Sequence, residues 1–301
     1  MRLSTLCAVS LLAFSLVGCS SGIGQAPIST SGQSNAVAPA FHSGSPLVAV
    51  KDIETELAAA GPRYWAVLGL GSPTNVSITG PSAILGYHNV GVAGASQFSM
   101  SDGFVSKQVV ISSSATTNVS GPSVIKGGIV VDDSALSAAV TAAQSASGYF
   151  AGLSGSPGTP TDINITNPSG NMTVIATSHT TVVNLNDLIL NGGSTLTFQA
   201  SSPLWQFIVN VSGRFVIQGG SRIVASGVAP PRILYNIVGT GQDVAMGGGT
   251  QNGVPNSRVD GIVLATQRNI ALSPGFVRPE IIGGGQQITI TSGGQVADHD
   301  N

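Results

Sequence analysis

Short strand-like segments recur along most of this chain, and they constrain it to an all-β fold. Within each segment apolar residues alternate with Ser, Thr, Asn or Gln, and almost never with Lys or Glu. Segments of this kind include 75–78, 109–111, 172–175, 195–198, 207–211, 215–217, 233–237, 261–264, 270–272 and 288–291. Strands this short, spaced by roughly eight to twelve residues, are typical of a sandwich, a barrel or a coiled β-solenoid.

Two features favour the solenoid over the other two architectures. Uncharged polar residues at the outward positions are expected where these faces stack in ladders between coils. In addition, residues 75–84 read NVSITGPSAI and residues 118–125 read NVSGPSVI, a weak internal repeat of one strand, one turn and one inward Ile. A repeated turn of this kind is typical of coils that bury their apolar face only by stacking.

One alanine-rich segment, residues 135–146, departs from the strand pattern and predicts a single substantial helix. Asp132 and Asp133 stand where an N-cap is expected, and Gly148 stands where the helix is expected to end. Four residues share one face of this helix, which we therefore expect to lie along the flank of the β body: Leu136, Ala139, Val140 and Ala143.

The first residues, Met1–Cys19, have the order of a secretory signal, with an apolar run too short to span a bilayer. Its last four residues, LVGC, resemble the lipobox of bacterial lipoproteins, which implies acylation of Cys19 and a membrane attachment through the N-terminal lipid. Residues 20–47 are rich in Ser, Gly, Ala and Pro and predict a flexible spacer. A domain at 48–297 and a polar tail at 298–301 complete the expected organisation.

These N-terminal features predict a surface-exposed protein anchored by lipid to the cell envelope. Residues 20 and 21 are both Ser, and the absence of Asp there resembles lipoproteins sorted to the outer membrane of Gram-negative cells. Both cysteines, Cys7 and Cys19, precede the domain, so we expect no disulfide in it.

Composition argues against nucleic-acid binding and against catalysis. Only 8% of the residues are charged and the formal net charge is -2, which leaves no basic stripe for nucleic acid. The sequence contains four His and no nucleophile elbow, zinc motif or phosphate loop, so we expect no catalytic residue, no metal and no cofactor. One enzymatic alternative stays open, a β-helix polysaccharide-degrading enzyme in which Asp187, Asp243 and Asp260 converge on a groove.

The last third of the chain resembles a known family. The segments 207–220, 232–237, 261–272 and 279–285 are similar to the choice-of-anchor A family of secreted bacterial domains. The resemblance extends over most of residues 60–297 and implies a right-handed β-helix with an adhesive role at the cell surface. The ice-binding β-helix proteins are related to it in architecture, since they share the flanking helix.

Ice binding needs a regular face of small Thr, Ser or Ala side chains. Two pairs of threonines fit this requirement, Thr195 with Thr197 and Thr289 with Thr291, because residues two apart project on the same side of a strand. The alternative interpretation is that threonine is simply favoured at exposed strand positions.

Other candidate ligand-binding residues are predicted in loops, where aromatic rings can stack on sugars. They are Tyr87, next to His88, and Phe276, near Arg278. Four isolated arginines indicate solubilisation of a charge-poor surface: Arg214, Arg222, Arg258 and Arg268. We therefore predict a non-catalytic module that adheres to a polysaccharide or a matrix protein, with ice binding as the alternative.

Overall fold

The computed structural model describes residues 50–58, 65–71, 73–167, 170–251, 254–255 and 257–298. The predicted leader with Cys19, the spacer at 20–47 and the last three residues of the predicted tail lie outside the described residues. Residues Ala49–Asn301 cluster as one compact unit.

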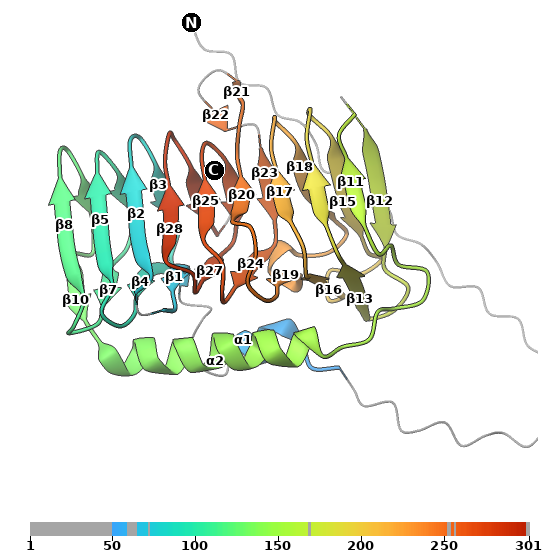
Figure 1. Cartoon of the computed structure of the whole chain (residues 1–301), viewed down its shortest axis with the longest axis horizontal. Helices are drawn as coiled ribbons and strands as arrows, with labels where there is room; N and C mark the ends of the chain where they lie inside the picture. The colour runs from blue at the N-terminus through green and yellow to red at the C-terminus, as the bar shows by residue number, and fades with distance from the viewer. Residues whose placement is uncertain are drawn as a thin grey trace, which may run out of the picture. The chain divides into compact units, whose positions relative to one another are not determined.

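Three parallel sheets of nine strands each form a three-sided β-helix, as the strand pattern predicted (Figure 1). Sheet A contains, in spatial order, β10 (Ile129–Val131), β7 (Val109–Ile111), β4 (Asn89–Val92), β1 (Trp65–Gly69), β27 (Ile281–Gly283), β24 (Ile262–Ala265), β19 (Ile233–Ile237), β16 (Gln206–Val211) and β13 (Thr180–Leu185). Sheet B contains β11 (Ile163–Ile165), β14 (Leu188–Leu190), β17 (Phe215–Ile217), β20 (Val244–Met246), β25 (Ile270–Leu272), β28 (Gln287–Ile290), β2 (Asn75–Thr79), β5 (Gln97–Ser101) and β8 (Thr116–Ser120).

Sheet C contains β12 (Asn171–Ile175), β15 (Thr195–Gln199), β18 (Arg222–Ser226), β23 (Arg258–Asp260), β26 (Phe276–Arg278), β29 (Gln295–Ala297), β3 (Ala83–Leu85), β6 (Phe104–Val105) and β9 (Val124–Ile125). A short antiparallel ladder, β21 (Thr250–Gln251) with β22 (Val254–Pro255), and a 3-10 turn, η2 (Pro230–Arg232), complete the β body.

The spatial order of the coils differs from the chain order. The chain begins in the middle with β1, β2 and β3 and coils outward to β8, β9 and β10 at one end. The helix α2 (Asp133–Ala151) then carries it along the body to β11, β12 and β13 at the other end, from which it coils back (Figure 1). The last coil pairs with the first, with Val67 opposite Ile281 and Val76 opposite Ile288, so the two halves form one continuous helix.

Alternating side chains build two apolar layers. Inward residues of all three sheets fill the lumen, where Phe198, Phe207, Phe215 and Tyr235 are fully buried and meet edge to face. The outward residues of sheet A are also buried, because the helices cover that sheet. Sheets B and C therefore remain as the two open faces of the molecule.

The helix α2 begins as predicted and ends later. Asp132 is the N-cap, and its Oδ1 accepts a hydrogen bond from the Ala135 N–H at 2.9 Å. The prediction that Gly148 stops the helix is wrong, since α2 continues to Ala151 and is capped by Gly152. The last turn is retained because Phe150 is fully buried in the layer between α2 and sheet A. Tertiary burial here outweighs the low helix propensity of glycine.

Asparagine side chains fasten α2 to sheet A. Asn236 Nδ2 donates to the Ser147 carbonyl at 3.0 Å, and Asn210 Nδ2 donates to the Phe150 carbonyl at 2.9 Å. Asn236 also donates to Asn210 Oδ1, and Asn210 donates in turn to Asn184 Oδ1. This ladder satisfies polar groups under the helix and fixes where α2 lies along the coils.

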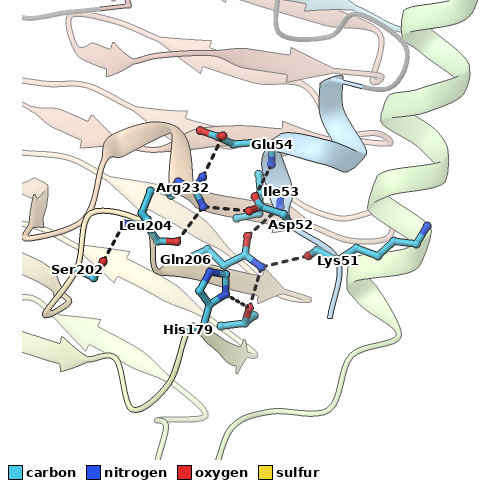
Figure 2. A network of polar contacts seen from close by, with 10 residues as sticks. Lys51, Asp52, Ile53, Glu54, His179, Ser202, Leu204, Gln206 and Arg232 are labelled. Carbon is cyan, nitrogen blue, oxygen red and sulfur yellow. Dashed lines mark hydrogen bonds and ion pairs between the residues drawn. The ribbon is translucent and has the colours of Figure 1, made fainter. Parts of the chain in front are cut away.

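A second, short helix, α1 (Ile53–Ala58), was not predicted. It is fixed by side chains distant in sequence, as Figure 2 shows. Gln206 Oε1 accepts the Ile53 N–H at 2.8 Å, and Arg232 forms ion pairs with Asp52 and Glu54 at 3.1 and 3.0 Å. Six residues carry too little periodicity to predict such a helix, and its position depends on these long-range contacts.

Arg268 was expected to solubilise the surface, and that prediction is wrong. The side chain is buried, and its guanidinium donates to four backbone carbonyls, those of Ser212, Gly213, Val238 and Gly239. Burial lowers the pKa of Arg268 from its ordinary value. Arg268 thus satisfies carbonyls at a corner where successive coils turn.

Candidate functional site

The outward row of sheet B is a regular, uncharged open surface of the molecule. One side chain from each strand stands next to that of the neighbouring strand, residue for residue, across all nine strands. In spatial order the row consists of Asn164, Ile189, Val216, Ala245, Ala271, Thr289, Ser77, Ser99 and Asn118. Neighbouring strands lie about 4.8 Å apart, so this row has a fixed repeat across the sheet.

Sheet B carries no charged side chain in any of its nine strands, all of which are described. Its two halves differ in chemistry. The row is aliphatic from Ile189 to Ala271, whereas Thr289, Ser77 and Ser99 present hydroxyl groups. A second hydroxyl row runs beside these, with Thr79 opposite Ser101 and Ser101 opposite Ser120. Residues two apart along a strand are separated by roughly 6.6 Å, so the hydroxyl half forms a two-dimensional array.

Sheet C differs from sheet B because its outward positions include charged and aromatic side chains. Arg222 pairs with Arg258 across the sheet, and Arg258 pairs with Phe276. The Arg258 guanidinium lies 5.5 Å from the centre of the Phe276 ring, and the Lys126 ammonium lies 5.2 Å from that of Phe104. Such cation–π pairs hold a positive charge next to an apolar surface.

Asp260 is the buried counter-charge of this face. Its carboxylate pairs with Arg258 Nε at 2.8 Å and with Arg278 Nη2 at 3.1 Å, and it accepts the Ala225 N–H at 3.1 Å. The Tyr235 hydroxyl donates to the Asp260 carbonyl at 3.0 Å, and burial raises the pKa of this phenol well above its usual value. The arrangement holds neighbouring strands of sheet C together rather than presenting a free carboxylate.

The three acids of the enzymatic alternative do not converge. Asp187 and Asp243 lie at the corner between sheets A and B, where Asp187 pairs with Arg214 at 2.6 Å and Asp243 accepts from Asn269 Nδ2 at 3.1 Å. Asp260 belongs to sheet C. The hydrogen bonds from Arg214 lower the pKa of Asp187. Within the described ranges no group of three His, Cys, Asp or Glu could hold a metal ion.

The two predicted threonine pairs lie on different faces. Thr195 and Thr197 belong to β15 of sheet C, while Thr289 belongs to β28 of sheet B, with Thr291 one position beyond that strand. The structure therefore does not bring the four residues into one surface. Sequence reasoning missed Ser77, Ser99 and their neighbours as members of the row of Thr289. Part of the signal was present, because apolar and uncharged polar residues alternate at 75–79 and 97–101, but the local sequence does not show that β2 pairs with β28.

The predicted aromatic candidates are also separated. Tyr87 lies in the turn between β3 and β4, is strongly exposed, and has the Lys107 ammonium 5.7 Å from its ring centre. Phe276 and Arg278 lie in strand β26 rather than in a loop, so their predicted loop setting is wrong. The side chain of Arg278 is mostly buried because it pairs with Asp260.

Two hollows in the described surface lie along α2. The larger one has a volume of about 600 Å³ and is lined by Glu56 with Ser, Ala and Thr side chains of α2. None of the helices in the described part of the chain is long and apolar enough to cross a membrane. The fold and its faces thus define a β-helix with two broad, open and chemically different surfaces.

The chain belongs to the family described as "Putative Ice-binding-like adhesive domain", whose model matches residues 25–296. Solved structures with similar folds are ice-binding proteins. One is from an Antarctic biological consortium, with a TM-score of 0.52, 14% identity and coverage of 80% of this chain and 88% of that chain. Another is LeIBP from an Arctic yeast, with a TM-score of 0.52, 14% identity and coverage of 83% and 97%.

A third similar structure is the DUF3494 domain of ice-binding protein 1 from Shewanella frigidimarina, with a TM-score of 0.50, 15% identity and coverage of 81% and 96%. At these identities the likeness concerns the fold. No curated protein matches the chain. The β-helix and its ice-binding-like adhesive class therefore follow from the family and the fold together.

Proposed function

We propose that this protein is a lipid-anchored surface protein that adheres to ice through sheet B. The observation that carries the proposal is the uncharged, in-register row from Asn164 to Asn118, with its array of hydroxyl groups in the half that contains Ser77 and Ser99. The names of the family and of the similar structures support ice or another external surface as the target.

The physical reason lies in how a surface meets ordered water. A charged side chain holds its own hydration shell strongly, and removing or reordering that shell is costly. Small hydroxyl and methyl groups on a rigid sheet bind water more weakly and at fixed spacings, so waters between them can adopt the order of a crystal. Sheet B provides this chemistry, whereas the arginines of sheet C do not.

The test compares one substitution on two faces. Ala271 lies on sheet B and Ala83 on sheet C, both are partly buried strand alanines, and both belong to outward rows. Ala271→Lys is expected to reduce partitioning into a growing ice crystal and inhibition of ice recrystallisation by an order of magnitude or more, which corresponds to about 1.4 kcal/mol. Ala83→Lys is expected to retain both. Equal behaviour of the two variants, with both folded, would refute the assignment to sheet B.

The lipid anchor is a separate part of the proposal. It rests on the LVGC sequence that ends at Cys19, and it places the domain on the outside of the cell envelope, at the outer membrane in a Gram-negative cell. Incorporation of labelled palmitate into the wild-type protein and its loss in Cys19→Ser would support it. A protein that is released to the medium without label would contradict it.

Sheet C supports a second candidate, adhesion to an acidic polysaccharide or a matrix protein. The pairs Arg258 with Phe276 and Lys126 with Phe104 combine a cation with an aromatic ring at one surface. A glycan array read with the Phe104→Ala and Lys126→Gln variants tests this candidate, because neither residue contacts Asp260. In both candidates the protein binds without catalysis, and release of sugar from a polysaccharide by the wild type would contradict that inference.

A further inference from the structure

The end of the β-helix formed by β8, β9 and β10 is open. In these strands the side chains that point along the lumen have no coil above them, and Val119, Ile129 and Val131 are exposed, the last by 57%. Five of the eight large exposed apolar residues in the described chain lie here: Val119, Val124, Ile129, Val130 and Val131. In Figure 1 this end lies at the left, and no described element lies beyond it.

The opposite end is largely closed. There the inward residues Ile163, Val174, Val183 and Leu185 are buried and Ile165 and Met172 are partly buried, although they also belong to terminal strands. The segment after α2 covers the outer edge of β13, since the Ser156 N–H donates to the Val182 carbonyl at 2.8 Å and the Val182 N–H donates to Ser156 Oγ at 2.9 Å. The exposure at the first end is therefore not a general property of terminal coils in this fold.

The open end also lacks the devices that usually protect strand edges. Natural edge strands carry Lys, Pro or inward charges that prevent pairing with another chain. Strands β8, β9 and β10 contain none of these residues, and the single charge between residues 113 and 131 is Lys126, whose ammonium lies over the Phe104 ring of sheet C. Among the described residues no strand pairs with the outer edge of β8.

We propose that this end is a dimer interface at which β8 pairs antiparallel with β8 of a second copy. A second copy is the occupant that this surface fits, because β8, β9 and β10 carry no charged side chain and two copies of these strands therefore oppose no like charges. With Asn118 on the two-fold axis, Thr117 lies opposite Val119 of the second copy, so inward residues meet inward residues. Because both copies use the same surface about a two-fold axis, the pair is closed and does not grow into a fibre.

The size of the surface agrees with a weak but specific dimer. A stable interface uses about 20–30 residues on each side, and residues 113–131 supply close to the lower limit. We therefore expect a dissociation constant between about 1 and 100 μM. The pairing would also join the two B sheets edge to edge at Asn118. It does not depend on what sheet B binds, because the test reads association alone.

The first experiment measures mass by light scattering and sedimentation on the chain begun at Ser20, between about 1 and 300 μM, a range that brackets the expected dissociation constant. The wild type is expected to pass from monomer to dimer. Val119→Lys places a charge inside the interface and is expected to remain monomeric. The control is Ile175→Lys, which changes an apolar residue that is 62% exposed at the closed end, and is expected to dimerise as the wild type does. Circular dichroism melts establish that both variants are folded.

The second experiment uses a disulfide as a geometric probe. Both natural cysteines precede Ser20, so Asn118→Cys introduces the only thiol of this chain. Directly opposed residues of an antiparallel pair have Cβ atoms about 4.5–5.5 Å apart, close to what a disulfide requires. Oxidation is expected to give a covalent dimer from Asn118→Cys and none from Ile175→Cys. A wild type that is monomeric at 300 μM, a Val119→Lys dimer, larger oligomers, or cross-linking by Ile175→Cys alone would each overturn the proposal.

Discussion

Replacing Asp260 by Asn tests whether pairing is what makes the buried charges of sheet C tolerable. The Asp260 side chain is 1% exposed, and its carboxylate meets two guanidinium groups and one backbone N–H within 3.1 Å. Asparagine keeps the shape of the side chain but removes the charge and one acceptor oxygen. It also turns an amide NH2 toward groups that can only donate hydrogen bonds, so one donor must lose its partner.

The expected magnitude follows from this burial. Removing one member of a buried ion pair costs about 3–5 kcal/mol, because the two guanidinium groups lose the carboxylate that balances their charge at this site. For a domain of this size such a loss corresponds to a decrease in Tm of roughly 6–20 °C. Hydrophobic packing around Asp260 is unchanged by the substitution, so the loss reports on the charges and their hydrogen bonds.

The control is a second Asp–Arg pair of the β body. Asp187 pairs with Arg214 at 2.6 Å, a shorter distance than in the buried pair, but the Arg214 side chain is 49% exposed. Exposed ion pairs contribute little to stability, so Asp187→Asn is expected to lower Tm by a small fraction of the Asp260→Asn effect. Both variants are compared with the wild type by circular dichroism melts and by urea unfolding followed by tryptophan fluorescence. If the two substitutions lower stability equally, burial is not what governs the cost and the reasoning fails.

Three further predictions concern other parts of the fold. Gln206→Leu removes the side chain that accepts the N–H at the start of α1, so limited proteolysis and hydrogen exchange are expected to show α1 released while α2 stays protected. The pKa of Asp187 is lowered in the folded protein, so its contribution to stability is complete above its ordinary pKa of 3.8 and is lost as the pH falls through the folded pKa. Between pH 7 and pH 2 the Tm of Asp187→Asn should therefore decrease less steeply than the Tm of the wild type. Gly261→Ala is expected to destabilise the fold strongly, because the added Cβ would lie 2.4 Å from the Tyr235 ring and φ at this position is +139°. Gly293→Ala has a positive φ but nothing within 4 Å of its added Cβ, so thermal melts of the two variants separate the steric clash from the backbone strain.

The sequence predicted the parts of the fold that depend on local alternation. Inward Val, Ile and Leu separated by uncharged polar residues predicted the β-helix, and the repeated turn at 80–84 and 121–125 occupies the same corner in two coils. The pairing of β1 with β27 was not predictable, because strands more than two hundred residues apart become neighbours only after α2 reverses the direction of growth. Arg268 was misjudged for a similar reason, since its carbonyl partners come from preceding coils.

The candidate site was less predictable than the fold, because the turns at the corners of the β-helix decide which sheet each strand joins. Thr195 and Thr289 have the same local pattern, yet one lies on sheet C and the other on sheet B. Which sheet a strand joins is set by how many residues the chain uses to turn, and Gly, Ser and Asn turns of different lengths look alike in sequence. Ser77, Ser99 and Thr289 could be recognised as one row only from the pairing of β2 with β28, where the last coil meets the first.

The distribution of charge among the three sheets is the strongest reason to regard sheet B as a binding surface. Sheet A needs no charge because helices cover it, and sheet C carries Arg222, Arg258, Asp260 and Arg278 within its strands. Sheet B is open to solvent and carries no charge in its strands, although a charge in its outer strand β8 would hinder pairing with another chain. An extended exposed face that is partly aliphatic and carries no charge resembles the exposed apolar patches that mark interaction sites. The lack of charge on this face is explained if the face binds ordered water, because a charged side chain would hold its own hydration shell and disturb that order.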